Sequence, residues 1–532
     1  MSLRKTAVRT FLALLCGAST LALLAQPSAA FEVVGGKKYL VWGGRTPPSN
    51  FDPAQKFDAP HHVFDSAIYE PLVKYAGDPA KIVPWLAASW TESPDAKVWT
   101  FKLDPRAKFQ NGDPVDAAAV KYSFVRQLAI NKGVAWMLSP ILKPDSITVV
   151  DPTTIKFTLD QPSPSFIGYV PWWMIVNPKQ ITPNVVNNDE GQAWMMSHTA
   201  GSGPFDVKAF QQDAVYQLQA VDNYWKGWPE GDKHLGGVIY QVIREPSAQR
   251  TALMTKHADM VEGLTTSDYQ QLAKMPGITI ENNVGAAQFA IKFNYTKGPT
   301  ADVNLRKAIA YALDYSALPD LYAGDAKLMT SPFPSAIEGH VDVPDFPHQD
   351  LAKAKEYLAK TKWANGGLTL EYVSQQGNDE TRRVGLILLS SLQPLGITVK
   401  LTPLLWANMV ANAESPDTAA NMTGLFMATY TADPDAEASQ YDKSAWGQWF
   451  GVSHYDDPAV FDLIQKGKTT ADWNARAPIY AEIQKRLTAD QPEVFGYVPN
   501  VRLAHRDYVK GYQYDPIEMS GFADFGALWI DQ

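Results

Sequence analysis

Two short segments in the first third of the chain alternate apolar and polar residues. Apolar side chains occupy every second position in Trp99–Leu103 and in Thr154–Leu159. This period of two is typical of half-buried strands in an antiparallel sheet. Between the two segments, Val120 and Phe124 recur at helical spacing, which predicts a helix over Ala117–Ile130. The pattern therefore predicts a mixed region of strands and helix.

The second half of the chain has a different pattern, dominated by amphipathic helices. Apolar residues at a spacing of three and four predict helices over Val303–Leu318 and around Ile479–Leu487. A third helix, Arg382–Leu392, is followed by the turn Pro394–Gly396 and the apolar strand Ile397–Leu401. Helix, turn and strand in this order indicate an α/β lobe.

The first thirty residues have the pattern of an export signal. Arg4, Lys5 and Arg9 precede the apolar stretch Phe11–Leu24, and the small residues Ser28–Ala30 follow as a cleavage site. We therefore predict a signal peptide over residues 1–30. No later stretch reaches the 18 apolar residues typical of a membrane helix.

Composition narrows the class of protein. The chain has 532 residues, more than one hydrophobic core usually supports, and its single cysteine, Cys16, lies in the leader. Leu15 precedes that cysteine where a lipid-attachment signal needs a small residue, so we expect no lipid anchor. The net charge of −9 disfavours a nucleic-acid partner. Large aromatic residues are plentiful, and 16 tryptophans could supply the walls of a binding cleft.

The sequence contains no convincing catalytic motif. Gly467–Thr470 resembles the end of a phosphate-binding loop, but Asp462 stands where that loop needs its first glycine. Gly201–Gly203 surrounds a serine, but Pro204 follows at once and favours a turn over a nucleophile elbow. We therefore predict no catalytic residue.

Metal and cofactor motifs are equally weak. His61–His62 has no third ligand close in sequence, and adjacent side chains point apart. Asp433, Asp435 and Glu437 alternate like the start of a calcium loop, but the glycine and the glutamate that complete such a loop are missing. We expect no metal and no cofactor.

A series of short motifs nevertheless marks nearly the whole mature chain. It resembles the extracytoplasmic solute-binding proteins of ABC importers, in the family of dipeptide- and oligopeptide-binding proteins. The matching stretches are Ile68–Val73, Pro84–Trp90, Lys97–Phe101, Phe109–Pro114, Val120–Phe124, Gly201–Phe205, Asp222–Trp225 and Arg306–Asp314 with Asn294. Each motif is weak alone, but their order and spacing are specific.

The resemblance implies an α/β fold, a bilobed clamshell with an extra subdomain inserted in the first lobe. In such proteins ligand binds between the lobes and is buried when they close. The expected division is lobe I from residues 31–60, 200–290 and 500–532, the inserted subdomain from residues 61–199, and lobe II from residues 291–499.

The resemblance also indicates ligand-binding residues. Peptide-binding members use an acidic residue of lobe II to bind the ligand's amino group, and here either Asp433 or Asp435 is eligible, with Asp433 favoured. Arg382 and Arg383, at the start of a helix, are candidates for the ligand carboxylate, although simple exposure explains them as well. The further candidates are three tryptophans that could equally be core residues: Trp406, Trp446 and Trp449.

The implied function is capture of short peptides in the periplasm and delivery to the permease subunits of an inner-membrane ABC importer, by a protein expected to be monomeric. Two alternatives remain open. The ligand could be an opine, an oligosaccharide, haem or a nickel chelate, or the protein could be a periplasmic peptide hydrolase. The absence of a lipid-anchor signal suits a freely diffusing protein.

Overall fold

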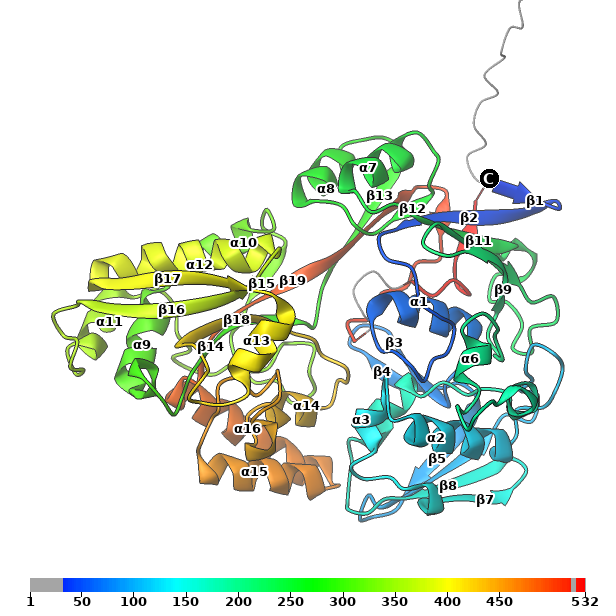
Figure 1. The fold of residues 1–532 in the computed structure, drawn as a ribbon, viewed down its shortest axis with the longest axis horizontal. Coiled ribbons are helices and arrows are strands. Elements are labelled where there is room, and N and C mark those ends of the chain that lie inside the picture. The colour runs from blue at the N-terminus through cyan, green and yellow to red at the C-terminus, as the bar shows by residue number, and fades with distance from the viewer. Residues whose placement is uncertain (1–31, 518–522, 532) are drawn as a thin grey trace, which may run out of the picture.

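The computed structural model describes residues 32–517 and 523–531, so the predicted signal peptide at residues 1–30 lies outside the described residues. The molecule has two lobes, and the long strand β19 (Glu493–Arg506) runs from one to the other (Figure 1). β19 pairs with β14 in one lobe and with β12 and β13 in the other. The described chain contains no helix with the length and apolar character needed to cross a membrane.

Lobe I is built on a mixed sheet with the strand order β9-β10-β11-β2-β12-β19. β2 pairs in parallel with β11 and β12, and its buried Trp42 packs edge-on against Phe525 of the C-terminal segment. The strands are β1 (Glu32–Val34), β2 (Lys37–Gly44), β9 (Phe205–Gln211), β10 (Val215–Ala220), β11 (Gly237–Val242), β12 (Met260–Val261), β13 (Ile278–Val284), β20 (Val509–Lys510) and β21 (Trp529–Ile530). The helices are α1 (Ala59–Ile68), α7 (Pro246–Met254) and α8 (Thr266–Leu272).

A smaller sheet of order β5-β6-β8-β7, covered by a helix, forms the extra subdomain beside lobe I (Figure 1). Phe124 of the helix packs against Phe157 of the sheet and against Trp173, both at 4.7 Å between ring centroids. The strands are β5 (Ala87–Glu92), β6 (Val98–Leu103), β7 (Ile147–Asp151) and β8 (Thr154–Thr158), next to the hairpin β3 (Val73–Ala76) and β4 (Lys81–Pro84). The helices are α2 (Ala117–Ile130), α3 (Ala135–Leu138), α4 (Phe166–Tyr169), α5 (Pro178–Ile181) and α6 (Gln192–Met195). The two strands and the helix predicted here from periodicity are confirmed.

Lobe II has the strand order β17-β16-β18-β14-β19, with helices on both faces. Its other strands are β14 (Gln288–Phe293), β15 (Ala326–Leu328), β16 (Leu368–Gln375), β17 (Ile397–Leu404) and β18 (Met422–Met427). The helices are α9 (Val303–Ala312), α10 (Ala317–Asp320), α11 (Leu351–Leu358), α12 (Asp379–Leu392), α13 (Trp406–Ala413), α14 (Pro434–Ser439), α15 (Pro458–Thr469) and α16 (Trp473–Asp490). The predicted helix, turn and strand correspond to α12 and β17.

One predicted helix is wrong in its length. The pattern over Val303–Leu318 predicts one helix, but α9 ends at Ala312 because Leu313 has an extended backbone. Asp314 then accepts a hydrogen bond from the backbone N–H of Ser316. This local side-chain bond competes with helix continuation, so the chain turns before α10 begins.

The expected division into lobes stays a prediction, but two of its boundaries fall inside single elements. Residue 61 lies in α1, whose Phe64 and Ile68 pack into the core of lobe I. Residue 500 lies in β19, which both lobes share. Sequence motifs could not reveal these continuities, because each depends on which sheet an element joins.

Candidate functional site

The candidate site begins with one face of α1. Asp58 caps the helix by accepting a hydrogen bond from the backbone N–H of His61, and Pro60 is in the first turn. His62, Ser66 and Tyr69 then recur at a spacing of four and three, so they share one face. All three line a cavity of about 480 Å³.

The end of α1 is held by the turn that contains Gly201 and Gly203. The backbone N–H of Gly203 donates to the carbonyl oxygen of Ile68 at 2.8 Å. A Cβ atom on Gly201 would overlap that same carbonyl group, so the position requires glycine. The glycine motif of the sequence therefore anchors the helix that carries the site.

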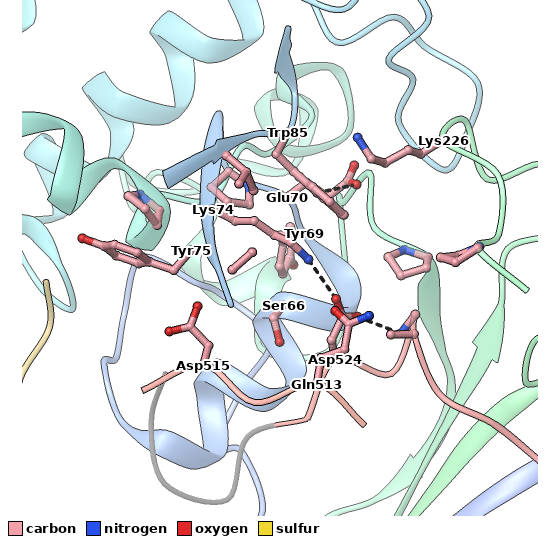
Figure 2. Close-up of a pocket in the computed structure, with 18 of the residues that line it drawn as sticks. Ser66, Tyr69, Glu70, Lys74, Tyr75, Trp85, Lys226, Gln513, Asp515 and Asp524 are labelled. Atoms are coloured by element: carbon pink, nitrogen blue, oxygen red, sulfur yellow. Dashed lines mark hydrogen bonds and ion pairs between the residues drawn. The ribbon is translucent and has the colours of Figure 1, made fainter. Parts of the chain in front are cut away.

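The cavity lies where lobe I meets the extra subdomain and is bounded by segments far apart in the sequence (Figure 2). Besides α1, its walls come from β3 and β4, from Pro171–Met174, from the loop at residues 224–229, and from the C-terminal segment around residues 513–527. Its volume suits a small organic ligand.

Glu70 organises one wall of the cavity. The side chain is buried, and its carboxylate accepts hydrogen bonds from the indole N–H of Trp85 at 2.9 Å, from that of Trp225 at 2.7 Å and from the Tyr224 hydroxyl at 2.5 Å. Burial raises the pKa of Glu70, although these donors oppose the effect. The three bonds hold the 224–229 loop against β4.

Charged groups of both signs line the same cavity. Lys74 of β3 forms an ion pair with Asp524 of the C-terminal segment at 2.9 Å (Figure 2). Burial raises the pKa of Asp524, but the Lys74 ammonium and the backbone N–H groups of Gly526 and Ala527 together outweigh burial, so the pKa lies below its ordinary value. The ammonium groups of Lys74 and Lys226 lie 3.8 and 4.1 Å from the ring centroid of Trp85.

The edge of the cavity touches lobe II. The Tyr75 hydroxyl is hydrogen-bonded to Thr431 Oγ1 and to the carbonyl oxygen of Gly168, both at 2.9 Å. The Trp172 indole donates to the carbonyl oxygen of Tyr430 at 2.6 Å. Tyr75 and Trp172 both line the cavity, so lobe II meets lobe I at its rim.

The predicted acidic residues follow directly after this contact. Asp433 caps α14 and receives two hydrogen bonds from the guanidinium of Arg476, at 2.5 and 2.8 Å. Asp435 is buried, with Ser165 and Tyr480 hydroxyls each 3.4 Å from its carboxylate. Burial raises the pKa of Asp435 to about 6. Asp433 is thus already paired, and Asp435 faces the contact between the lobes.

The predicted arginines, Arg382 and Arg383, are the fourth and fifth residues of α12, and both are exposed. Arg382 forms an ion pair with Asp379 at 2.6 Å on the helix surface. Their role toward a ligand carboxylate stays a prediction.

The predicted tryptophans gather on lobe II. Trp406 and Trp449 contact each other at 5.7 Å between ring centroids, and Trp406 is 42% exposed. Trp446 donates its indole N–H to the carbonyl oxygen of Tyr455. Among the described residues around the cavity, none of the seven predicted site residues contributes to its lining.

Sequence reasoning missed the lining residues, although two signals for them were present. Glu70 and Tyr224 belong to the family-like motifs, which served only to indicate a family. The helical spacing of His62, Ser66 and Tyr69 was the second signal. Neither could reveal that these segments meet in space.

Within residues 32–517 and 523–531, no group of three or more His, Cys, Asp or Glu side chains is arranged to hold a metal ion.

Comparison with known proteins adds the family. Residues 81–457 match the family described as bacterial extracellular solute-binding proteins, family 5. The chain belongs to this family. Its members are binding proteins, which agrees with the expectation from the motifs.

Individual members of the solute-binding family match over nearly their whole length. The probable D,D-dipeptide-binding periplasmic protein DdpA of Escherichia coli is 30% identical over 498 residues, covering 90% of this chain and 92% of that protein. The periplasmic binding protein DppA of Helicobacter pylori, solved in complex with the peptide STSA, is 26% identical with a TM-score of 0.76, covering 93% and 98% of the two chains. The substrate-binding protein CtaP of Listeria monocytogenes is 22% identical with a TM-score of 0.82, covering 93% and 99% of the two chains, and shows the same fold. The predicted bilobed α/β clamshell is confirmed.

Proposed function

We propose that this solute-binding protein captures short peptides between its lobes and delivers them to the permease subunits of an ABC importer. The observation that carries the proposal is the cavity of about 480 Å³ between lobe I and the extra subdomain, whose rim residues Tyr75 and Trp172 bond directly to lobe II. A ligand in this cavity lies beside the contact that forms when the lobes close. A ligand stabilises the closed state only if it binds that state more tightly than the open state.

The lining of the cavity suits a small ligand that carries one positive and one negative group and has apolar surface between them. Lys74, Lys226 and Asp524 place positive and negative groups around aromatic walls that include Trp85 and Trp172. A short peptide carries an ammonium group and a carboxylate group at its ends, with apolar surface between them. The names of the Escherichia coli and Helicobacter pylori relatives, both peptide-related, support the same ligand class.

The predicted signal peptide and the relatives support a location in the periplasm. A cleaved signal peptide over residues 1–30 would release the protein into the periplasm, where the Escherichia coli relative is placed by its name. We expect a monomer that contacts the permease only transiently and that releases its ligand chemically unchanged.

The test is calorimetric binding with the purified exported protein and a panel of di-, tri- and tetra-alanine. We expect saturable binding and, by mass spectrometry, intact peptide after prolonged incubation. Binding instead to an opine, a maltooligosaccharide, haem or a nickel chelate would contradict the peptide assignment. Cleaved peptide would contradict the role of a pure binding protein.

A further inference from the structure

A buried cluster of polar side chains lies in lobe II, against the strands β14 and β19. Lys292 of β14 donates to Glu493 of β19 at 2.6 Å and to the amide oxygen of Gln440 at 2.7 Å. Glu437 of α14 joins the cluster by accepting hydrogen bonds from the amide groups of Gln288 at 2.9 Å and Gln440 at 3.0 Å. All five residues are buried, so water is largely excluded from the cluster.

The charges of this cluster balance when one of its two carboxyl groups is protonated. Lys292 supplies one positive charge, and its ammonium bonds directly to Glu493. Burial raises the pKa of Glu437 to about 7; the hydrogen bond from Thr429 and the Lys292 ammonium oppose this effect, and the Glu493 carboxylate adds to it. Tyr441 also faces the cluster, and burial raises the pKa of its hydroxyl, which stays neutral. Glu437 is therefore the group that titrates near neutral pH.

The hydroxyl of Thr429 lies between Glu437 and a backbone carbonyl group. Thr429 Oγ1 is 2.8 Å from Glu437 Oε1 and 3.0 Å from the carbonyl oxygen of Ala286. A hydroxyl has a single hydrogen, so beside an ionised Glu437 it satisfies only one of these two acceptors fully. Gln288 and Gln440 both donate to the other carboxyl oxygen, Oε2, which places the proton of the acid on Oε1.

Protonation of Glu437 lets both short contacts of Thr429 become hydrogen bonds. The protonated acid donates to Thr429 Oγ1, and the hydrogen of Thr429 then points to the carbonyl oxygen of Ala286. These two bonds, from Glu437 through Thr429 to Ala286, form the Thr429 relay. Ionisation of Glu437 draws the hydrogen of Thr429 away from Ala286 and opens the relay.

The relay ends where the two lobes join. Ala286 lies in the crossing from lobe I to lobe II, between β13 and β14. Thr429 directly precedes the segment Tyr430–Thr431, which accepts hydrogen bonds from Tyr75 and Trp172 at the contact between the lobes. A bond from Thr429 to Ala286 therefore fixes the contact segment relative to the crossing.

We propose that protonated Glu437 is a positioning residue for closure of the lobes around the ligand. Through the Thr429 relay it fixes the segment Tyr430–Thr431 in the position that meets lobe I. A segment that is already fixed loses less entropy when the lobes close, so the protein binds its ligand more tightly at acidic pH than at alkaline pH. The inference rests on the proposed function and adds regulation by pH to it.

The test measures trialanine binding by calorimetry from pH 5 to pH 8. Glu437→Gln keeps a donor toward Thr429 and mimics the protonated acid, whereas Thr429→Val removes the relay and Thr429→Ser keeps its hydroxyl. Glu356→Gln, at an exposed residue of α11, is the control. The amino group of the peptide and the buried Asp435 titrate in every variant, so the pH profiles are compared with one another.

We expect wild type to lose about three- to tenfold in affinity between pH 5 and pH 8 relative to Glu437→Gln, the worth of one hydrogen bond. Thr429→Val should bind weakly throughout, with the pH profile of Glu437→Gln. Thr429→Ser and the control should keep the profile of wild type. Circular dichroism checks that the variants are folded.

A second measurement needs no ligand. Small-angle scattering of the ligand-free protein should show a larger radius of gyration at pH 8 than at pH 5 in wild type, and no such change in Glu437→Gln or Thr429→Val. If peptide binds but all profiles equal that of wild type, the relay is wrong and peptide capture stands. If no peptide binds but the scattering differences appear, the relay stands and the peptide assignment fails.

Discussion

Asp433 and Arg476 form a bidentate ion pair that joins the start of α14 to α16 inside lobe II. Arg476 is 3% exposed, and it also donates to the carbonyl oxygen of Gly467 on α15. The pair therefore holds three helices together directly behind the segment Tyr430–Thr431 that meets lobe I. A residue expected from the sequence to bind ligand thus has a structural partner.

The first prediction concerns Asp433→Ala. Removing one partner of a mostly buried ion pair leaves Arg476 uncompensated, so we expect the free energy of unfolding to fall by about 2–4 kcal/mol. Chemical denaturation measures it, with Asp462→Ala on the exposed face of α15 as the control. Unchanged stability together with lost peptide binding would restore Asp433 as the amine-binding residue.

The second prediction concerns the contact between the lobes. Tyr75→Phe removes the bond to Thr431, and Trp172→Phe removes the bond to the Tyr430 carbonyl. Each bond is worth about 0.5–1.5 kcal/mol, so we expect a more open ligand-free protein and up to about tenfold weaker peptide binding. Small-angle scattering measures the radius of gyration, with Tyr357→Phe in lobe II as the control. A radius unchanged in both variants would show that these bonds do not hold the closed form.

The third prediction concerns Glu70→Gln. An amide offers one acceptor oxygen where the carboxylate serves three donors, so the Trp85, Tyr224 and Trp225 bonds cannot all persist. We expect a loss of about 1–3 kcal/mol in stability and weaker peptide binding, because the cavity wall loosens. Denaturation and calorimetry measure these effects. Glu230→Gln, at an exposed residue directly after the 224–229 loop, should change neither, and an equal effect of the two variants would contradict the role given to Glu70.

The fourth prediction concerns the pH dependence of stability at Asp65. Its pKa in the folded protein lies well above 3.8, the ordinary value, so raising the pH ionises the unfolded state first and destabilises the fold. Below pH 3.8 the acid is protonated in both states and contributes nothing. We expect the stability of ligand-free Asp65→Asn to exceed that of wild type by an amount that grows from pH 4 upwards and levels off above the folded pKa.

Thermal unfolding across pH 3–9 measures this difference, with Asp145→Asn, at an exposed residue of the extra subdomain, as the control. A difference that is constant with pH would mean that folding does not shift the pKa of Asp65.

The sequence predicted local elements well where the signal lies within a few residues. The helix Ala117–Ile130 was found with its predicted bounds, and α12 and β17 follow each other as expected. Backbone hydrogen bonds within a helix join residues four apart, so the side-chain periodicity of one segment is enough to predict that segment as a helix. The helix over Val303–Leu318 was predicted too long. The backbone N–H of Ser316 donates to the Asp314 carboxylate after the end of α9, and side-chain periodicity gives no sign of such a local bond.

By itself, the sequence determined the family, the mixed α/β class and the absence of a recognisable catalytic motif, because short motifs in a fixed order carry that information. Only the tertiary structure decided where the candidate cavity lies and which charged groups pair with each other. Asp433 and Arg476 are 43 residues apart, and Lys74 and Asp524 are 450 apart. Contacts at such separations depend on how whole sheets and helices pack, since burial of apolar surface across the molecule selects them.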